Sequence, residues 1–207
     1  DRNAEGQMRL APLVRIPQEG DEDFKWAIKQ ALDLGAMGII LPHVDRAEEA
    51  VRMVRAMRYP PFRDTPYPAP RGERGWGPGG ATRLWGLNSV DYARRADVWP
   101  LNPQGEIMLG LKIENRRALA NARETTRVPG IAFAEWGPGD MHMFHGYASA
   151  VEPYSEELLA ARAKVKAASD EADLFFLDGA SKEDVAERID EGVMIISGRS
   201  GEDGARV

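Results

Sequence analysis

The chain contains no cysteine, which excludes disulfide bonds and thiolate metal sites. Any metal ion would therefore have to be bound by oxygen atoms or by histidine, of which there are only three. No apolar run approaches the roughly 20 residues that a membrane span needs, and residues 1–10 lack the charged and then apolar layout of a signal peptide. We therefore expect a soluble, cytoplasmic protein without a membrane partner, and the lack of cysteine fits a reducing cytoplasm.

The sequence also lacks any long run of charges of one sign. The 27 basic and 33 acidic side chains give a formal net charge of −6 and are interspersed along the chain. Nucleic-acid-binding proteins usually carry a basic face or tail, so a nucleic-acid partner is not expected. With 207 residues, 43% of them hydrophobic, the chain is long enough for one domain with a substantial core, and we expect a single domain over residues 1–207.

Two kinds of segment alternate along the chain. The first is short, apolar and rich in β-branched residues, which is typical of strands buried on both faces of a parallel sheet. The predicted strands are Ala11–Ile16, Met37–Val44, Ile107–Ile113, Ile131–Trp136, Leu174–Leu177 and Val193–Ser197. The second kind is amphipathic, with apolar residues at helical spacing. The predicted helices are Asp23–Leu34, Arg46–Arg58, Arg116–Thr126, Ser155–Ala172 and Ser181–Glu191.

This alternation predicts an α/β fold with a parallel sheet, either doubly wound or closed into a barrel. A doubly wound nucleotide-binding sheet usually has a glycine-rich turn after its first strand, and LVRIPQEG has none. We therefore favour a (β/α)₈ barrel. Only six strands are predicted where a barrel needs eight, so we expect the sequence to be incomplete, without the first two strands and the last helix. The proline- and glycine-rich stretch 63–105 is expected to be a lid or an interface excursion rather than barrel wall.

In such a barrel the catalytic groups stand where strands end. The polar side chains at those positions are Arg15, His43, Lys112, Glu114, Asp140, Asp178 and Arg199. Glu114 and Asp140 follow adjacent strands, so they could hold a divalent cation, and oxygen ligands favour Mg²⁺ or Mn²⁺ over zinc. The alternative is that each carboxylate only caps the helix that follows it.

Other strand-end groups have a functional and a structural interpretation. The turn before Asp140 reads GPG, and its backbone N–H groups could receive a carboxylate, although an ordinary strand-to-helix turn has the same composition. Arg15 could face an anionic substrate and stabilise an enolate oxygen, or pair with a neighbouring acid. His43 is a candidate substrate contact. His142 and His145 have the spacing for a metal pair, but local hydrogen bonding is the commoner use.

Several blocks, taken in order, resemble a known family. They are LVRIP, ALDLGAMGIILPHVDRAEEAVRMVRAMRYPP, RGWGP, LKIENRRAL and VPGIAFAEWGPGDM. From about residue 10 to 145, and more loosely to 199, the chain is similar to the HpcH/HpaI aldolases, the metal-dependent (class II) pyruvate aldolases that include 2-dehydro-3-deoxyglucarate aldolase. The resemblance implies a barrel of the phosphoenolpyruvate/pyruvate type and a homo-oligomer, a hexamer or a trimer.

The resemblance also implies roles for individual residues. Glu114 and Asp140 would be the metal carboxylates, and the backbone N–H groups of Gly139 and Asp140 would receive the carboxylate of a 2-oxo acid. Arg15 would hold the pyruvate oxygen and stabilise the enolate. Asp33, which by itself reads as a surface acid, would orient a catalytic histidine.

The chain departs from the family pattern at four places. The EH-containing segment that carries the family's catalytic histidine is not present, which puts proton transfer in doubt. Lys112 stands where a glutamine is usual, at a position expected to contact substrate. The turn is GPGDM instead of GPADL, and additional residues lie between Pro61 and Ile107, where they should alter the aldehyde-facing mouth or the oligomer contact.

The resemblance thus implies a carbon–carbon lyase that reversibly cleaves a 4-hydroxy-2-oxo acid to pyruvate and an aldehyde with Mg²⁺ or Mn²⁺, Co²⁺ being possible. Two alternatives stay open. One is an oxaloacetate decarboxylase or a citramalyl-type lyase that shares the enolate chemistry. The other is a barrel that binds ligands without catalysis, which the missing histidine segment favours.

Overall fold

A computed structural model describes residues 3–4, 8–17, 24–63, 65–148 and 153–198. In these residues seven strands form one sheet with the order β1-β2-β4-β5-β6-β7, and β3 pairs with β4. All pairings are parallel. The strands are β1 (Leu13–Arg15), β2 (Gly38–Leu41), β3 (Val98–Trp99), β4 (Ile107–Lys112), β5 (Phe133–Glu135), β6 (Phe175–Ala180) and β7 (Ile195–Gly198).

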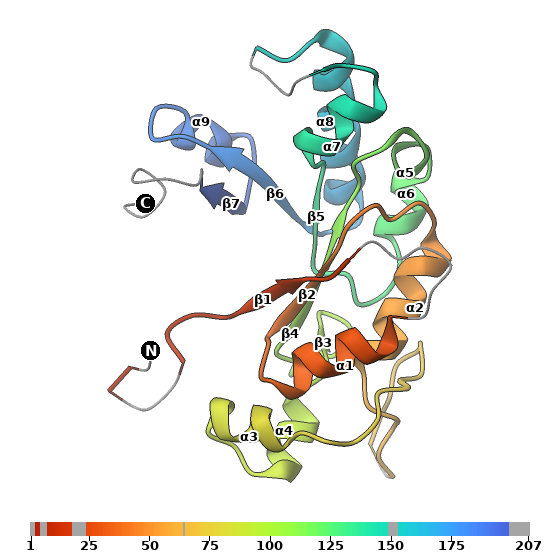
Figure 1. Ribbon diagram of the computed structural model, residues 1–207, viewed down its shortest axis with the longest axis vertical. Helices are drawn as coiled ribbons and strands as arrows, with labels where there is room; N and C mark the ends of the chain where they lie inside the picture. The colour runs from red at the N-terminus through yellow and green to blue at the C-terminus, as the bar shows by residue number, and fades with distance from the viewer. Residues whose placement is uncertain (1–2, 5–7, 18–23, 64, 149–152, 199–207) are drawn as a thin grey trace.

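The sheet is curled like half of a barrel, and helices α1, α2, α6 and α8 follow one another along one of its faces (Figure 1). This arrangement is consistent with the α/β barrel-like fold expected from the alternation of strands and helices. The helices are α1 (Lys25–Asp33), α2 (Ala47–Met57), α3 (Gly79–Trp85), α4 (Ser89–Arg95), α5 (Arg116–Ala120), α6 (Ala122–Thr126), α7 (Pro138–Phe144), α8 (Glu156–Glu171) and α9 (Val185–Asp190).

Two core clusters lie between the sheet and these helices. The first joins β2 and β4 to α1 and α2 and includes Ile39, Leu41 and Leu111. The second joins β5 and β6 to α8 and includes Ile113 and Val165. Burial of an aliphatic side chain contributes about 1.5–3 kcal/mol, so these clusters fix the strands whose ends carry the candidate site.

All six predicted strands form, but three predictions on the elements were wrong. The helix expected over Arg116–Thr126 is divided at Asn121, where the backbone (φ −98°, ψ 7°) leaves the helical range and the side-chain amide donates to Asp45 O at 2.8 Å. The helix expected from Ser181 begins only at Val185, because the Ser181 backbone N–H and hydroxyl both donate to Asp184 Oδ1 and form a turn.

The third wrong prediction concerns the stretch 63–105, which was expected to contribute nothing to the sheet. It contains β3, and Val98 and Trp99 pair with Ile107 and Met108 of β4. A two-residue strand between an aspartate and a proline has no readable periodicity. The part of the stretch nearest β4 is therefore sheet wall.

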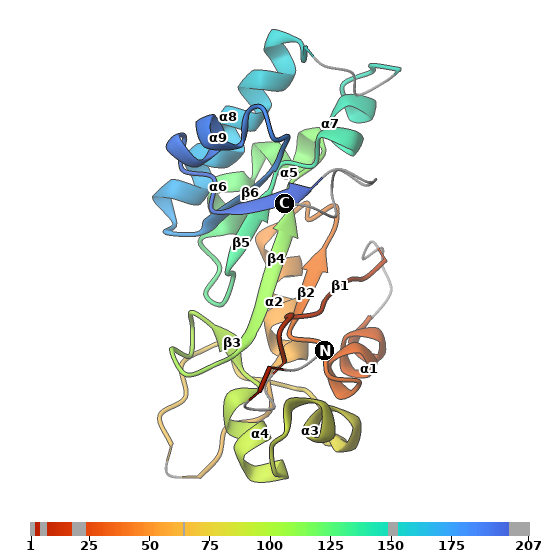
Figure 2. The same ribbon diagram turned by 90° about the vertical axis from the view of Figure 1, so that its left-hand side faces the viewer.

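The rest of this stretch is held by a buried guanidinium. Arg58, whose side chain is fully buried, donates to both oxygens of Asp97 at 2.5 and 2.9 Å and to the carbonyls of Pro68 and Pro70 at 2.7 Å. Helices α3 and α4 lie at the end of the sheet where β2 and β4 begin (Figure 2), where Trp85 Nε1 donates to Gly35 O at 3.0 Å. In this chain they are thus remote from the carboxyl ends of the strands, and a role in an oligomer contact stays a prediction.

Candidate metal centre

Three side chains that follow neighbouring strands converge at one point. His43 comes after β2, Glu114 after β4, and Asp140 lies in the first turn of α7 after β5. One ligand atom from each lies within 4.8 Å of the other two. His43 Nε2 is 3.7 Å from Glu114 Oε1 and 3.8 Å from Asp140 Oδ2. Because β2, β4 and β5 are parallel neighbours, their carboxyl ends meet at one edge, and this strand order brings the three side chains together.

The backbone at His43 is adapted to this arrangement. His43 has a φ of 52°, in the left-handed region that residues other than glycine rarely adopt. Its backbone N–H donates to Glu114 Oε1 at 3.1 Å. This hydrogen bond compensates part of the cost of about 1–3 kcal/mol for such a conformation. Glu114 therefore orients His43 as well as contributing a carboxylate.

Glu114 itself is completely buried. Burial raises the pKa of its carboxyl, and the positive charge of Lys112 and the imidazole of His43 act in the opposite direction. Among the described residues, no donor makes a well-directed hydrogen bond to its Oε2 atom, and His43 Nδ1 has no partner. The Lys112 ammonium lies 3.2 Å from Oε2 as an ion pair, and a buried carboxylate is costly unless such cations compensate it. Two carboxylates and one imidazole are donors that a divalent cation such as Mn²⁺ accepts, so the residues present fit a metal ion.

Gly137 allows the turn before α7 to approach this carboxylate. It precedes α7 with a φ of +54°, and a Cβ atom at this position would lie 2.3 Å from Glu114 Oε2. Only glycine fits there. At Gly139, by contrast, no atom of another described segment lies within 4 Å of where a Cβ would be, so the turn borders open space beside Asp140. This space is where the predicted substrate carboxylate would have to bind.

Lys112, the expected substrate contact, lies against the same carboxylate. Its Nζ is 3.2 Å from Glu114 Oε2 and 3.1 Å from Oε1 of Glu135, its register partner on β5. Burial would lower the pKa of Lys112, but the attraction of Glu135 and Glu114 outweighs burial and raises it. Lys112 is therefore a cation. Glu135 was not among the residues predicted from the sequence, although its position across from Lys112 follows once β4 and β5 are aligned.

Two residues predicted for the site were given roles other than metal binding. Arg15 is the exposed last residue of β1, which pairs with β2, so it ends at the same edge of the sheet as the strand before His43, and its contact with substrate stays a prediction. Asp33 ends α1, near the start of β2, and its Oδ1 accepts from Arg74 Nη2 at 2.7 Å while Lys29 donates to Oδ2. The orienting role expected for Asp33 involves a histidine that this sequence does not identify, and it stays a prediction.

The histidines of α7 make local contacts. His142 Nδ1 is 3.0 Å from Pro138 O, and His145 Nδ1 is 2.8 Å from Met141 O, each four residues back. Neither belongs to the cluster of His43, Glu114 and Asp140. The structural interpretation of this pair is therefore the better one.

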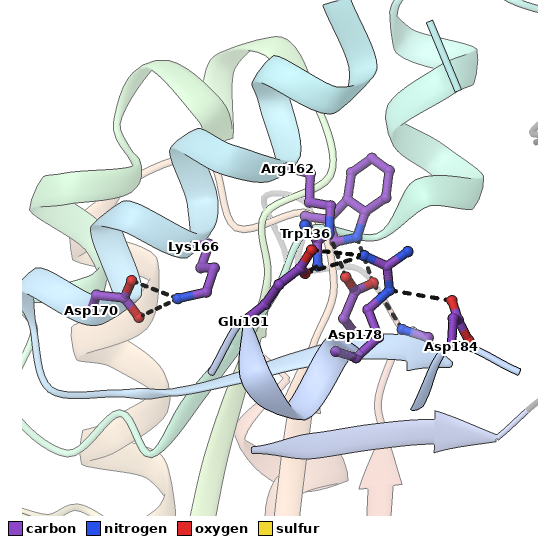
Figure 3. Close-up of polar contacts among 9 residues, drawn as sticks. Trp136, Arg162, Lys166, Asp170, Asp178, Asp184 and Glu191 are labelled. Carbon is purple, nitrogen blue, oxygen red and sulfur yellow. Dashed lines mark hydrogen bonds and ion pairs between the residues drawn. The ribbon is translucent and has the colours of Figure 1, made fainter. Parts of the chain in front are cut away.

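Asp178, which was expected to follow its strand, lies within β6 instead, because this strand continues to Ala180, and it connects elements of the fold (Figure 3). Trp136 Nε1 donates to one carboxylate oxygen at 2.8 Å, and Arg162 Nε of α8 donates to the other at 2.6 Å. Arg162 also donates to Glu191, at the end of α9, at 2.6 Å. Asp178 thereby links β6 to α8 and, through Arg162, to α9. Arg199 lies outside the described residues.

A curled parallel sheet with acidic and imidazole groups at its strand ends defines a protein of the α/β barrel-like class. Residues 2–200 match the HpcH/HpaI aldolase/citrate lyase family, and the chain belongs to this family. The resemblance seen in the sequence is thus confirmed.

Individual relatives agree with this assignment. A hydroxypyruvate/pyruvate aldolase of Delftia acidovorans is 38% identical over 138 residues, which are 66% of this chain and 44% of that protein. A 2-keto-3-deoxy-L-rhamnonate aldolase of Klebsiella pneumoniae is 35% identical over 137 residues, 66% of this chain and 43% of that protein. The chain therefore matches less than half the length of these curated relatives.

Solved structures show the same fold. A HpcH/HpaI aldolase/citrate lyase family protein from Burkholderia cenocepacia superposes with a TM-score of 0.69 at 22% identity, covering 90% of this chain and 65% of that one. A HpcH/HpaI aldolase from Desulfitobacterium hafniense gives 0.68 at 24% identity, with 89% and 63% covered. Among the helices that the structure describes, none combines the length and apolar character needed to traverse a bilayer.

Proposed function

We propose that this chain carries the metal centre of a carbon–carbon lyase that cleaves a 4-hydroxy-2-oxo acid to pyruvate and an aldehyde. The observation that carries the proposal is the convergence of His43, Glu114 and Asp140 within 4.8 Å in a member of the HpcH/HpaI family. Glu114 and Asp140 would hold the cation, with His43 as a third donor. Mg²⁺ or Mn²⁺ is the proposed metal, with Co²⁺ as a further candidate.

When bound, the cation would supply Lewis acidity that stabilises negative charge on the oxygen of the 2-oxo group. The chain's own groups would position the substrate. The N–H groups of Gly139 and Asp140 would receive the C1 carboxylate, and Arg15 would stabilise the enolate oxygen as charge develops. A base removes the C4 hydroxyl proton, the C3–C4 bond breaks to release the aldehyde, and protonation at C3 gives pyruvate. Lys112 lies close enough to the centre to contact the same substrate.

The test compares two carboxamide variants with the unmodified protein. Glu114→Gln and Asp140→Asn should each lose Mn²⁺ binding in calorimetric titration and reduce pyruvate formation by about 100-fold or more, because several kcal/mol of charge stabilisation are removed. Glu124→Gln, at an exposed position of α6, is the matched control and should behave like the unmodified protein. Full activity of a folded Glu114→Gln protein would overturn the proposal. Oxaloacetate in the same assay separates decarboxylation from aldol cleavage.

We further propose that the curled sheet is part of a (β/α)₈ barrel completed by strands and a helix outside this sequence. The proposal is supported by the solved relatives, of which this chain covers 65% and 63%. One domain over residues 1–207, with α3 and α4 of the 63–105 stretch at an oligomer contact, is part of the same proposal. A homo-hexamer or trimer in the cytoplasm is proposed from the family, and light scattering on the purified protein would measure the number of copies.

A further inference from the structure

Lys112 is a cation already present in the candidate metal centre. Its side chain is only 11% exposed, and Nζ lies 3.2 Å from Glu114 Oε2. Within the part of the chain that the structure describes, no donor makes a well-directed hydrogen bond to this oxygen. The ammonium therefore lies beside the negative charge that a divalent cation would have to share.

Two cations at one buried carboxylate repel each other, since the low effective dielectric of such a site screens charge poorly. When a metal ion binds at Glu114, the ammonium of Lys112 must therefore either move away or stay and weaken the binding by repulsion. A lysine without another partner would be left as an unpaired buried charge, which is strongly unfavourable.

Glu135 provides that other partner. Its Oε1 accepts from Lys112 Nζ at 3.1 Å, and the two residues are directly opposite each other in the β4–β5 ladder. The ammonium can thus leave Glu114 and stay paired with Glu135 without any change in the backbone.

We propose that Lys112 is a built-in competitor for the divalent cation at Glu114, and that Glu135 retains its ammonium when the cation binds. This inference rests on the proposed metal centre and adds a determinant of its affinity. The lysine keeps Glu114 charge-compensated in the empty protein and lowers the affinity for the metal ion. A purely structural ion pair would stabilise the fold but would not affect metal affinity in this direction.

The experiment measures Mn²⁺ affinity by isothermal titration, with free Mn²⁺ followed by electron paramagnetic resonance. Lys112→Gln should bind Mn²⁺ more tightly, on the order of tenfold or more, because the competing charge is gone. Lys112→Arg keeps the charge and should stay within about threefold of the unmodified protein. Lys166→Gln, which breaks an ion pair on α8, is the control for loss of a remote lysine. Circular dichroism confirms that each variant is folded.

Glu135→Gln extends the test. Without this acceptor the ammonium has only Glu114, so Mn²⁺ affinity should fall, and the fall should be larger in the original protein than in the Lys112→Gln background. Equal falls in both backgrounds would overturn the role of Glu135 as the retaining partner.

The outcomes separate this inference from the proposed function. Tighter binding by Lys112→Gln supports the inference, most strongly if the unmodified protein binds Mn²⁺ only weakly. Unchanged or weaker binding by a folded Lys112→Gln protein overturns it and leaves the metal centre in place. If neither protein binds Mn²⁺ at millimolar concentration, the metal centre itself is refuted, and the competitor role with it.

Discussion

Substitution of Gly137 by alanine should damage both the fold and the metal centre. Alanine at a φ of +54° costs about 1–2 kcal/mol, because the left-handed conformation brings Cβ too close to the backbone. The new methyl group would also lie 2.3 Å from Glu114 Oε2 and 2.5 Å from Glu114 Cβ. Forcing an extra group into a packed site costs about 1–3 kcal/mol more. The free energy of unfolding should therefore fall by about 2–5 kcal/mol.

Gly146 offers a control that separates the two contributions. It also has a positive φ, +86°, but none of the described residues has an atom within 4 Å of where its Cβ would be. Gly146→Ala should thus lose only the conformational part, about 1–2 kcal/mol. Gly139→Ala, in open space within α7, should be neutral or stabilise by up to about 1 kcal/mol.

Urea unfolding followed by circular dichroism measures these differences, and Mn²⁺ titration reports the position of Glu114. In Gly137→Ala the affinity for Mn²⁺ should fall by about tenfold or more, since misplaced neighbours of metal ligands have effects of that size. If Gly137→Ala and Gly146→Ala lose the same free energy of unfolding, and Gly137→Ala still binds Mn²⁺ normally, the steric argument is refuted.

Two further predictions concern charged groups outside the centre. Arg58→Lys keeps the positive charge but loses the forked hydrogen bonds to buried Asp97, so it should lower the free energy of unfolding by about 1–3 kcal/mol. Arg55→Lys, at an exposed ion pair, should change it by less than about 1 kcal/mol in the same urea titration. Partial burial alone would raise the pKa of Glu191, but hydrogen bonds from Arg162 and Arg188 outweigh it and lower the pKa. The ionised carboxylate therefore stabilises the fold above its unfolded pKa, and this contribution is lost as the pH falls through the folded pKa, so Glu191→Gln should lower the free energy of unfolding by about 0.5 kcal/mol at pH 7 and not at pH 3. An equal loss at both pH values would contradict the reasoning.

The strands were predictable because short, apolar, β-branched runs bounded by turn residues rarely form anything but buried strands. Since parallel strands all end at one edge of a sheet, Glu114, Asp140 and His43 were expected at that edge, and the structure brings these three together. The same reasoning could not find Glu135, because its relevance depends on the register between β4 and β5. Register is set by packing across the sheet.

Other features depend on contacts between segments far apart in sequence. At the division of the Arg116–Thr126 helix, Asn121 donates a hydrogen bond to Asp45 O in a distant segment, which no local pattern reveals. The two-residue β3 exists because β4 offers a partner. Helix α4 was not predicted, although the sequence could have indicated its start, since Asn88 is a strong N-cap whose side chain accepts from the N–H groups of Val90 and Asp91.

The candidate centre lies where the two core clusters meet. His43 stands between Pro42 and Val44, and Val44 belongs to the first cluster, whereas Ile113 and Met141, next to Glu114 and Asp140, belong to the second. A metal ion bound by these three side chains would connect the two core clusters, which would otherwise be free to unfold in separate steps. Saturation with the metal ion should then merge their melting into one sharper calorimetric transition at higher temperature.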